Sequence, residues 1–444
     1  MTGPPPGVTS GGERERFDDL DAMTRPQLER WWEERLGQEL DVAYRELPFY
    51  RARFDAAGFH PGMFGHLDDL ALVPSFDKDD VLAAERRSGS AWVGLERLPA
   101  DAGDVAVTMS SGTTGTTFLA WPRRWRDEQG RSALRAHHWA GLRPGTPTLL
   151  VAPAWHAYAL VQPYLSEQTG SPVAVVSGTL LPRFADRLAD ALASFRPQLL
   201  WTFLPMLFSL LAHAEAAGTD PRELFASVES LVVAGAPVTA AMLAHLQRRT
   251  GVDRVVEFAG VSENLLAVAC NRSEGLHLVP DTCYAEVVEP LSGAKAEPGQ
   301  RGAVVLSTSV PWGSVYLRYR TGDLGWLDPG PCPCGLASPR IKIVGRAGEM
   351  FQLGRRRVLP YDVQLAVETV PEAVGVPFVI LGDALDRGRL ELTLAGSPPG
   401  PSVRAALRRA LGEVFEVPVE VAWQERLALQ FKGVATVAGG AGPG

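Results

Sequence analysis

Lysine is scarce in this chain of 444 residues, which contains only Lys78, Lys295, Lys342 and Lys432. Arginine supplies the rest of the positive charge, so each lysine is unusual enough to be weighed on its own. The four cysteines are too few for a disulfide framework. No run of about 18 apolar residues occurs, and we therefore expect no transmembrane helix. These absences argue against a disulfide-stapled scaffold and against a membrane-spanning protein.

Acidic residues outnumber lysine and arginine over the whole chain. The formal net charge is −8, with 46% hydrophobic and 21% charged residues, which is typical of a soluble globular protein. An acidic balance argues against nucleic acid or an anionic membrane as the main partner. The segment 1–16 is rich in proline and glycine and has no apolar core that could serve as a signal peptide. We therefore expect a cytoplasmic location.

A run of glycines and hydroxyl residues stands out in the sequence. Six of the nine residues in Met109–Thr117 carry hydroxyls and two are glycines. Such a turn can bring backbone N–H groups and hydroxyls close to an oligophosphate. It lacks the Gly-Lys-Ser/Thr ending of a P-loop, and a polar surface turn is the alternative. The residues of this loop that we expect to bind phosphate are Ser110, Ser111, Gly112, Thr113, Thr114, Gly115 and Thr116.

The pattern of apolar residues predicts an α/β fold. Residues 17–58 are largely helical in pattern, with Leu28, Trp32, Leu36 and Leu40 on one face. After Gly115, strands and helices alternate, which indicates a doubly wound parallel sheet. The expected strands are Thr148–Ala152, Val173–Val176, Gln198–Phe203, Leu231–Ala234 and Arg254–Phe258. The expected helices are one bearing Phe184, Leu188, Leu192 and Phe195, then Met206–Ala217 and Val238–Arg249.

The sequence pattern changes near residue 270, and the change predicts a β subdomain followed by a C-terminal domain. Short strands such as Tyr284–Val288 and Gly302–Ser307 indicate a small antiparallel β subdomain at about 270–345. A compact α/β pattern follows, with strands near Phe378–Ile380, Leu390–Leu394 and Val419–Val421 and a helix at Val403–Val414. We therefore predict an N-terminal domain at 17–346 and a small, mobile C-terminal domain at 347–437. Residues 1–16 and 438–444 have little to bury and are predicted to be disordered.

Three charged side chains could complete a nucleotide site. Glu263 follows a predicted strand, where open α/β sheets bind ligands, and its carboxylate suits Mg²⁺. Asp323 could accept hydrogen bonds from a sugar diol, and Arg346 offers a fixed cation nearby. Each has a simpler alternative, because Glu263 could be a solvated carboxylate, Asp323 a turn residue and Arg346 a surface charge. Their combination favours nucleotide binding.

In its motifs the chain resembles the adenylate-forming superfamily of acyl-CoA synthetases, and within it the phenylacetate–CoA ligase group. One such motif would be weak, whereas the shared order and spacing of many is specific. The motifs are Leu47–Arg51, Leu70–Pro74, Ser110–Gly115, Ala234–Pro237, Gly260–Glu263, Arg318–Asp323, Cys332–Gly335, Pro339–Ile341 and Gly345–Arg346.

The resemblance implies a two-step reaction with ATP. A carboxylate attacks the α-phosphate to give an acyl adenylate and pyrophosphate; the small domain then rotates, and a thiol, usually coenzyme A, displaces AMP. Phosphate would be held by the glycine-rich loop and Ser262, Mg²⁺ by Glu263, the ribose by Asp323 with Arg346 beside it, and the catalytic lysine would be Lys432. The adenine side would be formed by Ala234, Gly235, Ala236 and Pro237, together with Phe258, Ala259 and Gly260, although strand alternation directs Phe258 elsewhere.

The chain differs from the family pattern at three places. The family usually has a lysine after the second loop glycine, where this chain has Thr116, and an aromatic residue where it has Ala259. The glycine that usually precedes the catalytic lysine comes after Lys432 here, so a surface lysine is the alternative. These differences suit two other functions. One is an adenylating enzyme of specialised metabolism with a different acceptor, such as an amine, a carrier protein or a partner in N–N bond formation. The other is a non-catalytic relative that binds nucleotide.

Three cysteines and a histidine form a candidate zinc site. Cys270 and His277, with Cys332 and Cys334, supply the Cys₃His ligand set of many structural zinc sites. The alternative is a pair of ordinary turn cysteines with a solvated histidine. We expect Cys283 to be a small buried residue.

The acyl pocket is the least defined part of the site. Trp155, His156 and Tyr158 follow a predicted strand, and Phe203 is a second candidate wall. Apolar and aromatic lining suits an aromatic carboxylic acid, whereas His156 could equally be a buried, hydrogen-bonded histidine. The sequence gives neither the acid, the acceptor nor the oligomeric state, and a homodimer is left open.

Overall fold

A computed structural model gives the fold. The chain divides into two compact units, which are described separately below: unit 1 comprises residues 1–148, 152–175 and 258–343, and unit 2 comprises 149–151, 176–257 and 344–444. The predicted division at residue 346 into two domains stays a prediction. The residues described are 16–90, 93–96, 105–109, 118–122, 128–152, 157–176, 182–261, 265–311, 313–397, 399–425, 427 and 435–438.

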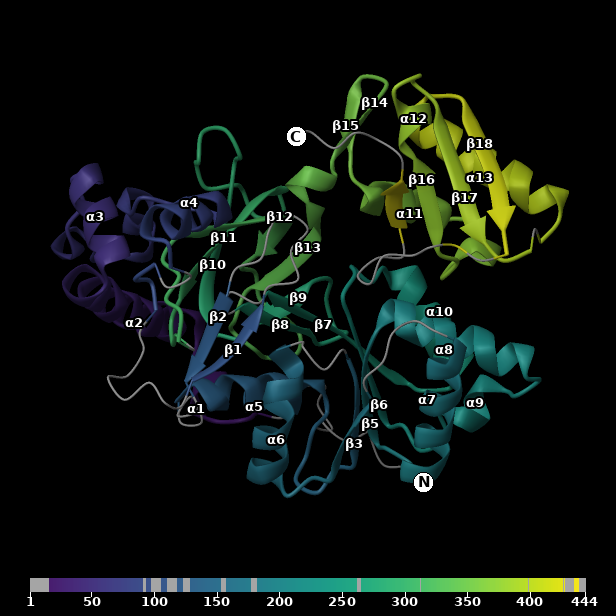
Figure 1. Cartoon of the computed structure of the whole chain (residues 1–444), viewed down its shortest axis with the longest axis horizontal. Coiled ribbons are helices and arrows are strands. Elements are labelled where there is room, and N and C mark those ends of the chain that lie inside the picture. The colour runs from purple at the N-terminus through teal and green to yellow at the C-terminus, as the bar shows by residue number, and fades with distance from the viewer. Residues whose placement is uncertain are drawn as a thin grey trace. The chain divides into compact units, whose positions relative to one another are not determined.

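Unit 1 begins with the helices that the sequence predicts. They are α1 (Asp19–Ala22), α2 (Arg25–Glu46) and α3 (Pro48–Ala57). The predicted stripe of α2, from Leu28 to Leu40, is buried throughout. Thr24 and Gln27 form a capping box at its start, in which Gln27 Oε1 accepts a hydrogen bond from Thr24 N at 2.8 Å. The amphipathic pattern therefore predicted both the helix and its buried face, and the helix is visible in purple in Figure 1.

Five further elements of unit 1 lie between residues 78 and 169. Met109 and Phe118 pair at the end of a two-stranded antiparallel sheet, so the chain leaves and returns at neighbouring points. A buried arginine, Arg135, lies on the next helix and is bound by Asp18, Asp21 and Asp281. The elements are α4 (Lys78–Ser88), β1 (Val105–Met109), β2 (Phe118–Pro122), α5 (Glu128–Ala140) and α6 (Ala157–Thr169).

The rest of unit 1 is a mostly antiparallel sheet, as the short-strand pattern predicts. Its strands follow the order β10-β11-β12-β13-β9-β8-β7, in which β7 is Arg254–Val261. They are β8 (Leu265–Ala269), β9 (Leu276–Leu278), β10 (Cys283–Val288), β11 (Gly302–Thr308), β12 (Tyr319–Asp328) and β13 (Arg340–Arg346).

The parallel strands follow β7 in the order β7-β6-β5-β3-β4, which confirms the predicted α/β class. Every residue of β5 and β6 is buried, as expected of parallel strands covered on both faces. The strands are β3 (Thr148–Val151), β4 (Val173–Val176), β5 (Leu199–Phe203) and β6 (Ser230–Ala234). The helices are α7 (Pro182–Phe195), α8 (Leu204–Ala216), α9 (Pro221–Leu224) and α10 (Ala240–Thr250).

Two predicted boundaries in this region were wrong. The helix expected from Val238 begins at Ala240, because Thr239 caps it by accepting a hydrogen bond from Met242 N. The strand expected to end at Phe258 continues to Val261 as β7 (Arg254–Val261). Its first half pairs in parallel with β6, and its second half pairs antiparallel with β8. This second set of hydrogen bonds extends the strand beyond its apolar core.

The C-terminal part of unit 2 has its own core. A four-stranded sheet of order β18-β17-β16-β19 packs with α11 and α13 around residues such as Phe378, Ile380 and Leu407. The strands are β14 (Phe351–Leu353), β15 (Arg356–Val358), β16 (Phe378–Leu381), β17 (Leu390–Ala395), β18 (Val419–Gln424) and β19 (Ala435–Ala438). The helices are α11 (Pro360–Val367), α12 (Gly382–Leu385) and α13 (Pro401–Phe415).

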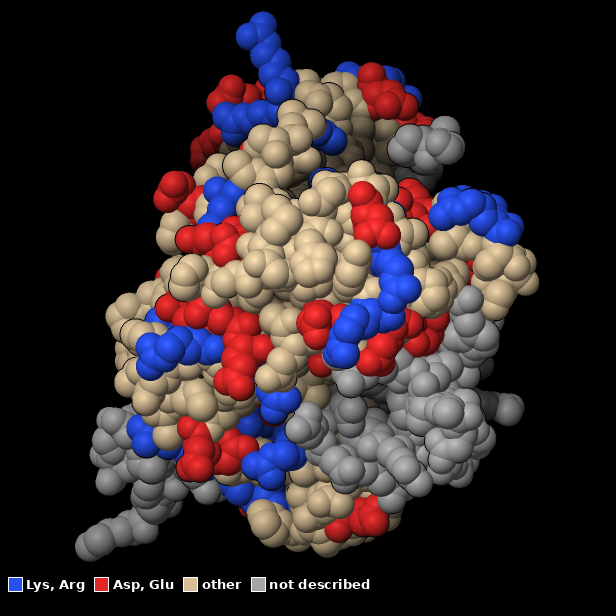
Figure 2. Space-filling model, turned by 90° about the vertical axis from the view of Figure 1, so that its left-hand side faces the viewer, with Lys and Arg blue, Asp and Glu red and all other residues tan. Residues whose placement is uncertain are grey.

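The surface agrees with the acidic composition. Figure 2 shows acidic and basic side chains interspersed over one face, without a continuous basic patch among its described residues. Within the part of the chain that the structure describes, no helix is long and apolar enough to cross a membrane.

Candidate functional site

Part of the predicted site lies outside the described residues. This holds for Ser110–Thr116, Trp155, His156, Ser262, Glu263 and Lys432, whose predicted roles stay predictions. Tyr158 is described by its backbone alone, in α6. The geometry of the site is therefore built from the remaining residues.

Asp323 lies in a bulge of β12. Ala303 pairs with Leu324 and Val305 pairs with Arg320, so the three residues Thr321–Asp323 oppose Val304 alone. The bulge is held by Thr321, whose hydroxyl accepts from Asp323 N at 3.0 Å and donates to Val304 O at 3.2 Å. Gly322 has φ +79°, a conformation that glycine adopts without strain. Bulges re-aim side chains and are common beside active sites, and Asp323 is only 6% exposed.

The segment leading into this bulge is fixed by two of the motifs near the N-terminus. The Tyr50 hydroxyl donates to Val315 O at 2.7 Å and accepts from Leu317 N at 3.0 Å. Arg318, at φ +57°, donates to Ala71 O at 2.6 Å and to Val73 O at 3.0 Å. Residues 47–51 and 70–74 therefore fix the start of the strand that carries Asp323.

The turn Ala234–Pro237 leaves the end of β6 in unit 2. Gly235 has φ +90°, and a Cβ atom there would lie 2.5 Å from Cδ1 of Phe203. Phe203 is buried and stacks edge-on against Trp201, with ring centroids 5.0 Å apart. Only glycine fits this close approach, which places Phe203 against the turn. Its role as a wall of the acyl pocket stays a prediction.

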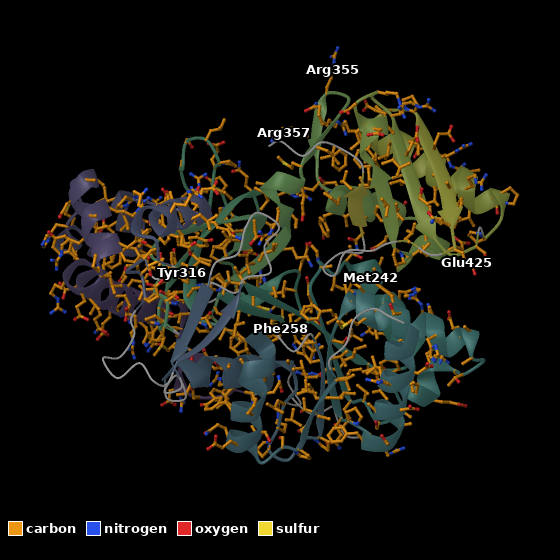
Figure 3. All side chains as sticks on the ribbon, viewed as in Figure 1. Met242, Phe258, Tyr316, Arg355, Arg357 and Glu425 are labelled. Atoms are coloured by element: carbon orange, nitrogen blue, oxygen red, sulfur yellow. The ribbon has the colours of Figure 1, made fainter. Side chains whose placement is uncertain are left out.

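Strand alternation in β7 separates Phe258 from its neighbours. Phe258 is fully buried, with its ring 5.7 Å from that of His137 on α5, and it is labelled in Figure 3. Ala259 is half-buried and Gly260 is exposed. Alternation along the strand directs Phe258 to the opposite face from Ala259, as expected, and its side chain lies in the core. Any nucleotide contact of Phe258 stays a prediction.

Arg346 ends β13 and begins a tight turn in unit 2. Its N–H donates to Oε2 of Glu349 at 3.1 Å. Gly345 has φ +145°, and a Cβ atom there would lie 3.3 Å from Leu359. The backbone at Arg346 is thus fixed, while its exposed guanidinium extends from the turn.

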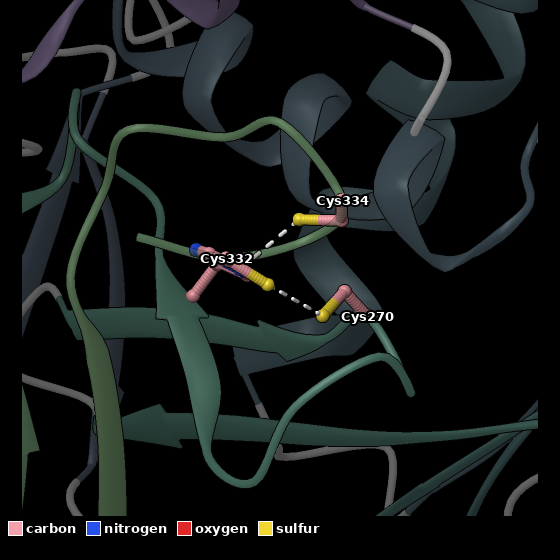
Figure 4. A group of neighbouring side chains, drawn as sticks. Cys270, Cys332 and Cys334 are labelled. Carbon is pink, nitrogen blue, oxygen red and sulfur yellow. Dashed lines mark hydrogen bonds between the residues drawn. The ribbon is translucent and has the colours of Figure 1, made fainter. Parts of the chain in front are cut away.

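The four predicted zinc ligands come together in unit 1. Cys270 follows β8, His277 lies in β9, and Cys332 and Cys334 lie between β12 and β13. Their ligand atoms all lie within 4.8 Å of one another. Cys270 Sγ is 3.6 Å from Cys332 Sγ, and Cys334 Sγ is 3.2 Å from His277 Nε2. Figure 4 shows the thiol of Cys270 meeting those of Cys332 and Cys334, which share one loop.

Hydrogen bonding orients the histidine of this cluster. His277 is fully buried, which contradicts the alternative of a solvated residue. Its Nδ1 lies 2.8 Å from Ser338 O, an arrangement that directs Nε2 towards the thiols. A hydrogen bond from Cys334 lowers the pKa of Cys270 and raises that of Cys334 itself. By contrast, burial raises the pKa of Cys283 to about 12, and this cysteine is a buried core residue as expected.

Some positioning residues escaped the sequence analysis. Ser338 orients His277, and Glu257 accepts a hydrogen bond from Val238 N at 3.1 Å, beside the turn Ala234–Pro237. Glu257 was visible in the sequence as a polar residue inside an apolar strand. For Ser338 there was no local signal, because its contact spans 61 residues.

Comparison with known proteins agrees with the motifs. The AMP-binding enzyme family matches residues 65–310, which is more than half of the chain. Phenylacetate-coenzyme A ligase of Thermus thermophilus is 29% identical over 368 residues, covering 80% of this chain and 78% of that protein. Phenylacetate-coenzyme A ligase of Escherichia coli K12 is 27% identical over 357 residues, covering 79% and 78%.

Solved structures agree on the fold. A 2-hydroxyisobutyryl-CoA ligase, in its postadenylation state with 2-HIB-AMP, has a TM-score of 0.81 at 20% identity and covers 94% of this chain and 91% of that one. The anthranilate CoA ligase AuaEII, in complex with anthranoyl-AMP, has a TM-score of 0.57 at 17% identity, covering 74% and 65%. Together with the motifs, these matches confirm the resemblance to the phenylacetate–CoA ligase group. The chain belongs to the AMP-binding enzyme family.

Proposed function

We propose that this protein is an ATP-dependent, AMP-forming ligase that joins an aromatic carboxylic acid to coenzyme A. The observation that carries the proposal is the similarity to phenylacetate-coenzyme A ligases over about four-fifths of both chains. The fold similarity to an anthranilate CoA ligase is compatible with an aromatic acid.

The proposed reaction has two steps. A carboxylate oxygen of the acid attacks the α-phosphorus of ATP, and the bond to pyrophosphate breaks. The thiolate of coenzyme A then attacks the acyl carbon, and AMP leaves with the electrons of the C–O bond. Such transfers depend mainly on positioning and on neutralising phosphate charge.

The described residues would serve the nucleotide. Asp323, held in the bulge of β12, would accept hydrogen bonds from the ribose hydroxyls. The turn Ala234–Pro237 would lie along the adenine, with Ala259 and Gly260 nearby in β7. Arg346 would stand near the ribose.

The remaining roles come from residues outside the described part of the chain. Ser110–Thr116 and Ser262 would bind phosphate oxygens, and Glu263 would hold Mg²⁺, which neutralises phosphate charge. Lys432 would be the catalytic lysine of adenylate formation. The acyl group would lie near Trp155, His156 and Tyr158.

We further propose that Cys270, His277, Cys332 and Cys334 hold a structural zinc ion. Zinc bound at about 2.3 Å to two sulfurs separates them by about 3.8 Å, close to the 3.6 Å between Cys270 and Cys332. The hydrogen bond to Ser338 leaves His277 Nε2 as the ligand atom. An ion here would join β8, β9 and the loop before β13, which supports a structural role.

Product analysis tests the proposed activity. The protein is incubated with ATP, Mg²⁺ and a panel of aryl acids, with and without coenzyme A. We expect pyrophosphate release with at least one acid, and a mass spectrum that contains its acyl-CoA only when coenzyme A is present. Adenylate formation without any acyl-CoA would contradict the choice of acceptor.

Two observations favour a second candidate. Thr116 stands where the family usually has a lysine, and Ala259 where it usually has an aromatic residue. These replacements suit an adenylating enzyme with an amine, a carrier protein or an N–N bond-forming partner as acceptor. They also suit a relative that binds nucleotide without turnover. Silence across the acid panel, with AMP still bound, would favour the latter.

A further inference from the structure

Side chains from three directions hold the turn Ala234–Pro237 and the residues that follow it. From the end of β5, Phe203 packs against Gly235. From β7, Glu257 Oε1 accepts a hydrogen bond from Val238 N at 3.1 Å. From α11, the carboxylate of Glu368 accepts the hydroxyl proton of Thr239.

The contact between Thr239 and Glu368 is buried. Thr239 is 6% exposed and Glu368 is 8% exposed. The Thr239 oxygen also accepts a hydrogen bond from Met242 N at 3.0 Å, so one hydroxyl caps α10 and binds the carboxylate; Met242 is labelled in Figure 3. The other carboxylate oxygen, Glu368 Oε1, accepts from Gln364 Nε2 at 2.8 Å. Each carboxylate oxygen of Glu368 therefore accepts one hydrogen bond, from Thr239 or from Gln364.

A second close contact joins the same two regions of unit 2. A Cβ atom on Gly375, which has φ +77°, would lie 3.0 Å from the His245 ring of α10 and 3.5 Å from Phe208 of α8. The segment after α11 thus approaches α8 and α10 as closely as glycine allows. Both contacts join residues 368–375 to the region of α8 and α10 within unit 2.

We propose that Glu368 is a positioning residue for the nucleotide, acting through Thr239 on the turn Ala234–Pro237. This inference rests on the proposed function, since it assumes that the turn lies along the adenine. The carboxylate sets the position of Thr239, Thr239 starts α10, and the turn is thereby held between β6 and α10. Residues 344–444 then influence ATP affinity through a buried hydrogen bond.

Three variants separate this role from general packing. Glu368→Gln presents one amide oxygen and one NH₂ group, so it cannot accept from both Thr239 and Gln364. Thr239→Val removes the hydroxyl, whereas Thr239→Ser keeps it. Glu372→Gln is the matched control, because Glu372 is an exposed carboxylate four residues further along.

The readouts are the KM values for ATP, acid and coenzyme A, with the thermal midpoint as a check on folding. We expect Glu368→Gln and Thr239→Val to raise the KM for ATP about tenfold, a change that corresponds to about 1.4 kcal/mol. The KM values for acid and coenzyme A should change less than twofold, and Thr239→Ser and Glu372→Gln should resemble the parent. An equal change in all three KM values, or none in the KM for ATP, would overturn the proposal.

Binding of AMP keeps this test independent of the proposed activity. The Kd for AMP, measured by calorimetry, should also rise about tenfold in Glu368→Gln. If the parent protein binds AMP but turns over no acid, the ligase assignment fails while this experiment still decides the role of Glu368. An unchanged Kd in a folded variant would then overturn it.

Discussion

The Asp323 bulge and the turn Ala234–Pro237 serve the same proposed nucleotide but are held in different ways. Asp323 sits inside a sheet, where the hydroxyl of Thr321, two residues away, accepts from Asp323 N and donates to Val304 O on the neighbouring strand. The turn in unit 2 is instead held by Phe203, Glu257 and, through Thr239, Glu368, all of them distant in sequence. The position of Asp323 therefore depends on the sheet as a whole. The position of the turn depends on each of the side chains that hold it.

The largest expected effect comes from disrupting the sheet around Asp323 through the cysteine cluster. Cys334→Ser removes one of four zinc ligands, and we expect loss of the ion and more than about 4 kcal/mol of unfolding free energy. Metal analysis and denaturant unfolding measure both. Cys283→Ala, at a buried cysteine outside the cluster, should keep about one zinc per chain. A parent protein purified without chelator but containing no zinc would contradict the site.

Replacing the carboxylate in the bulge tests the first half of the comparison. Asp323→Ala should lower kcat/KM for ATP about hundredfold, because a charge-assisted hydrogen bond to the ribose is worth up to about 3 kcal/mol. The backbone of the bulge should stay in place, since Thr321 holds it through its own hydroxyl, and the thermal midpoint measures any loss of folding. Steady-state kinetics with varied ATP check this, and an unchanged kcat/KM would remove Asp323 from the site.

Acid should lower the free energy of unfolding through a buried histidine, His137 of α5, which lies beside β7. Burial lowers the pKa of His137 to about 4, from 6.5 in the unfolded chain. The unfolded state therefore binds the proton more tightly, so stability is fully present above pH 6.5 and is lost as the pH falls towards 4. The loss attributable to His137 amounts to about 3 kcal/mol.

Denaturant midpoints between pH 4 and 7 measure this dependence. His137→Asn keeps a polar side chain but does not titrate, and its stability should depend less steeply on pH over the same interval. Identical slopes in both proteins would show that other groups carry the acid sensitivity.

The smallest expected effect concerns the turn in unit 2. Gly235→Ala brings a Cβ atom within 2.5 Å of Phe203 and strains a residue at φ +90°, which should cost about 2 kcal/mol. Gly218→Ala is the matched control, because Gly218 has φ +71° but nothing within 4 Å of its Cβ position. It should cost about 1 kcal/mol from backbone strain alone. Equal losses in the two variants would mean that the contact with Phe203 is not rigid.

Much of the fold followed from local patterns. The buried stripe of α2, the apolar strands β5 and β6 and the alternation that turns Phe258 inward are all properties of a few neighbouring residues. The cysteine cluster was also predictable from the sequence, because three cysteines and a histidine in one region have few roles other than binding a metal. Two boundaries failed. They are the start of α10, where Val238 N bonds to Glu257 instead of joining the helix, and the end of β7, which pairing with β8 extends to Val261.

The long-range parts of the site could not be predicted. The hydrogen bond between Thr239 and Glu368 spans 129 residues, and neither residue belongs to a periodic or glycine-rich pattern. The bulge at Asp323 is defined by what lies opposite it on β11, which the sequence of β12 alone does not contain. Contacts with residues distant in sequence determine these features, whereas local sequence propensity determines the helices and strands around them.

Strand β7 has a practical consequence for protein engineering. Residues 254–257 bond to one neighbour running in the same direction, and residues 258–261 bond to another running in the opposite direction. A fragment that ends or begins within this strand would leave one of the two neighbours with an open edge, which invites aggregation. Split reporters, circular permutants and truncation libraries of this protein should therefore place their cut sites outside residues 254–261.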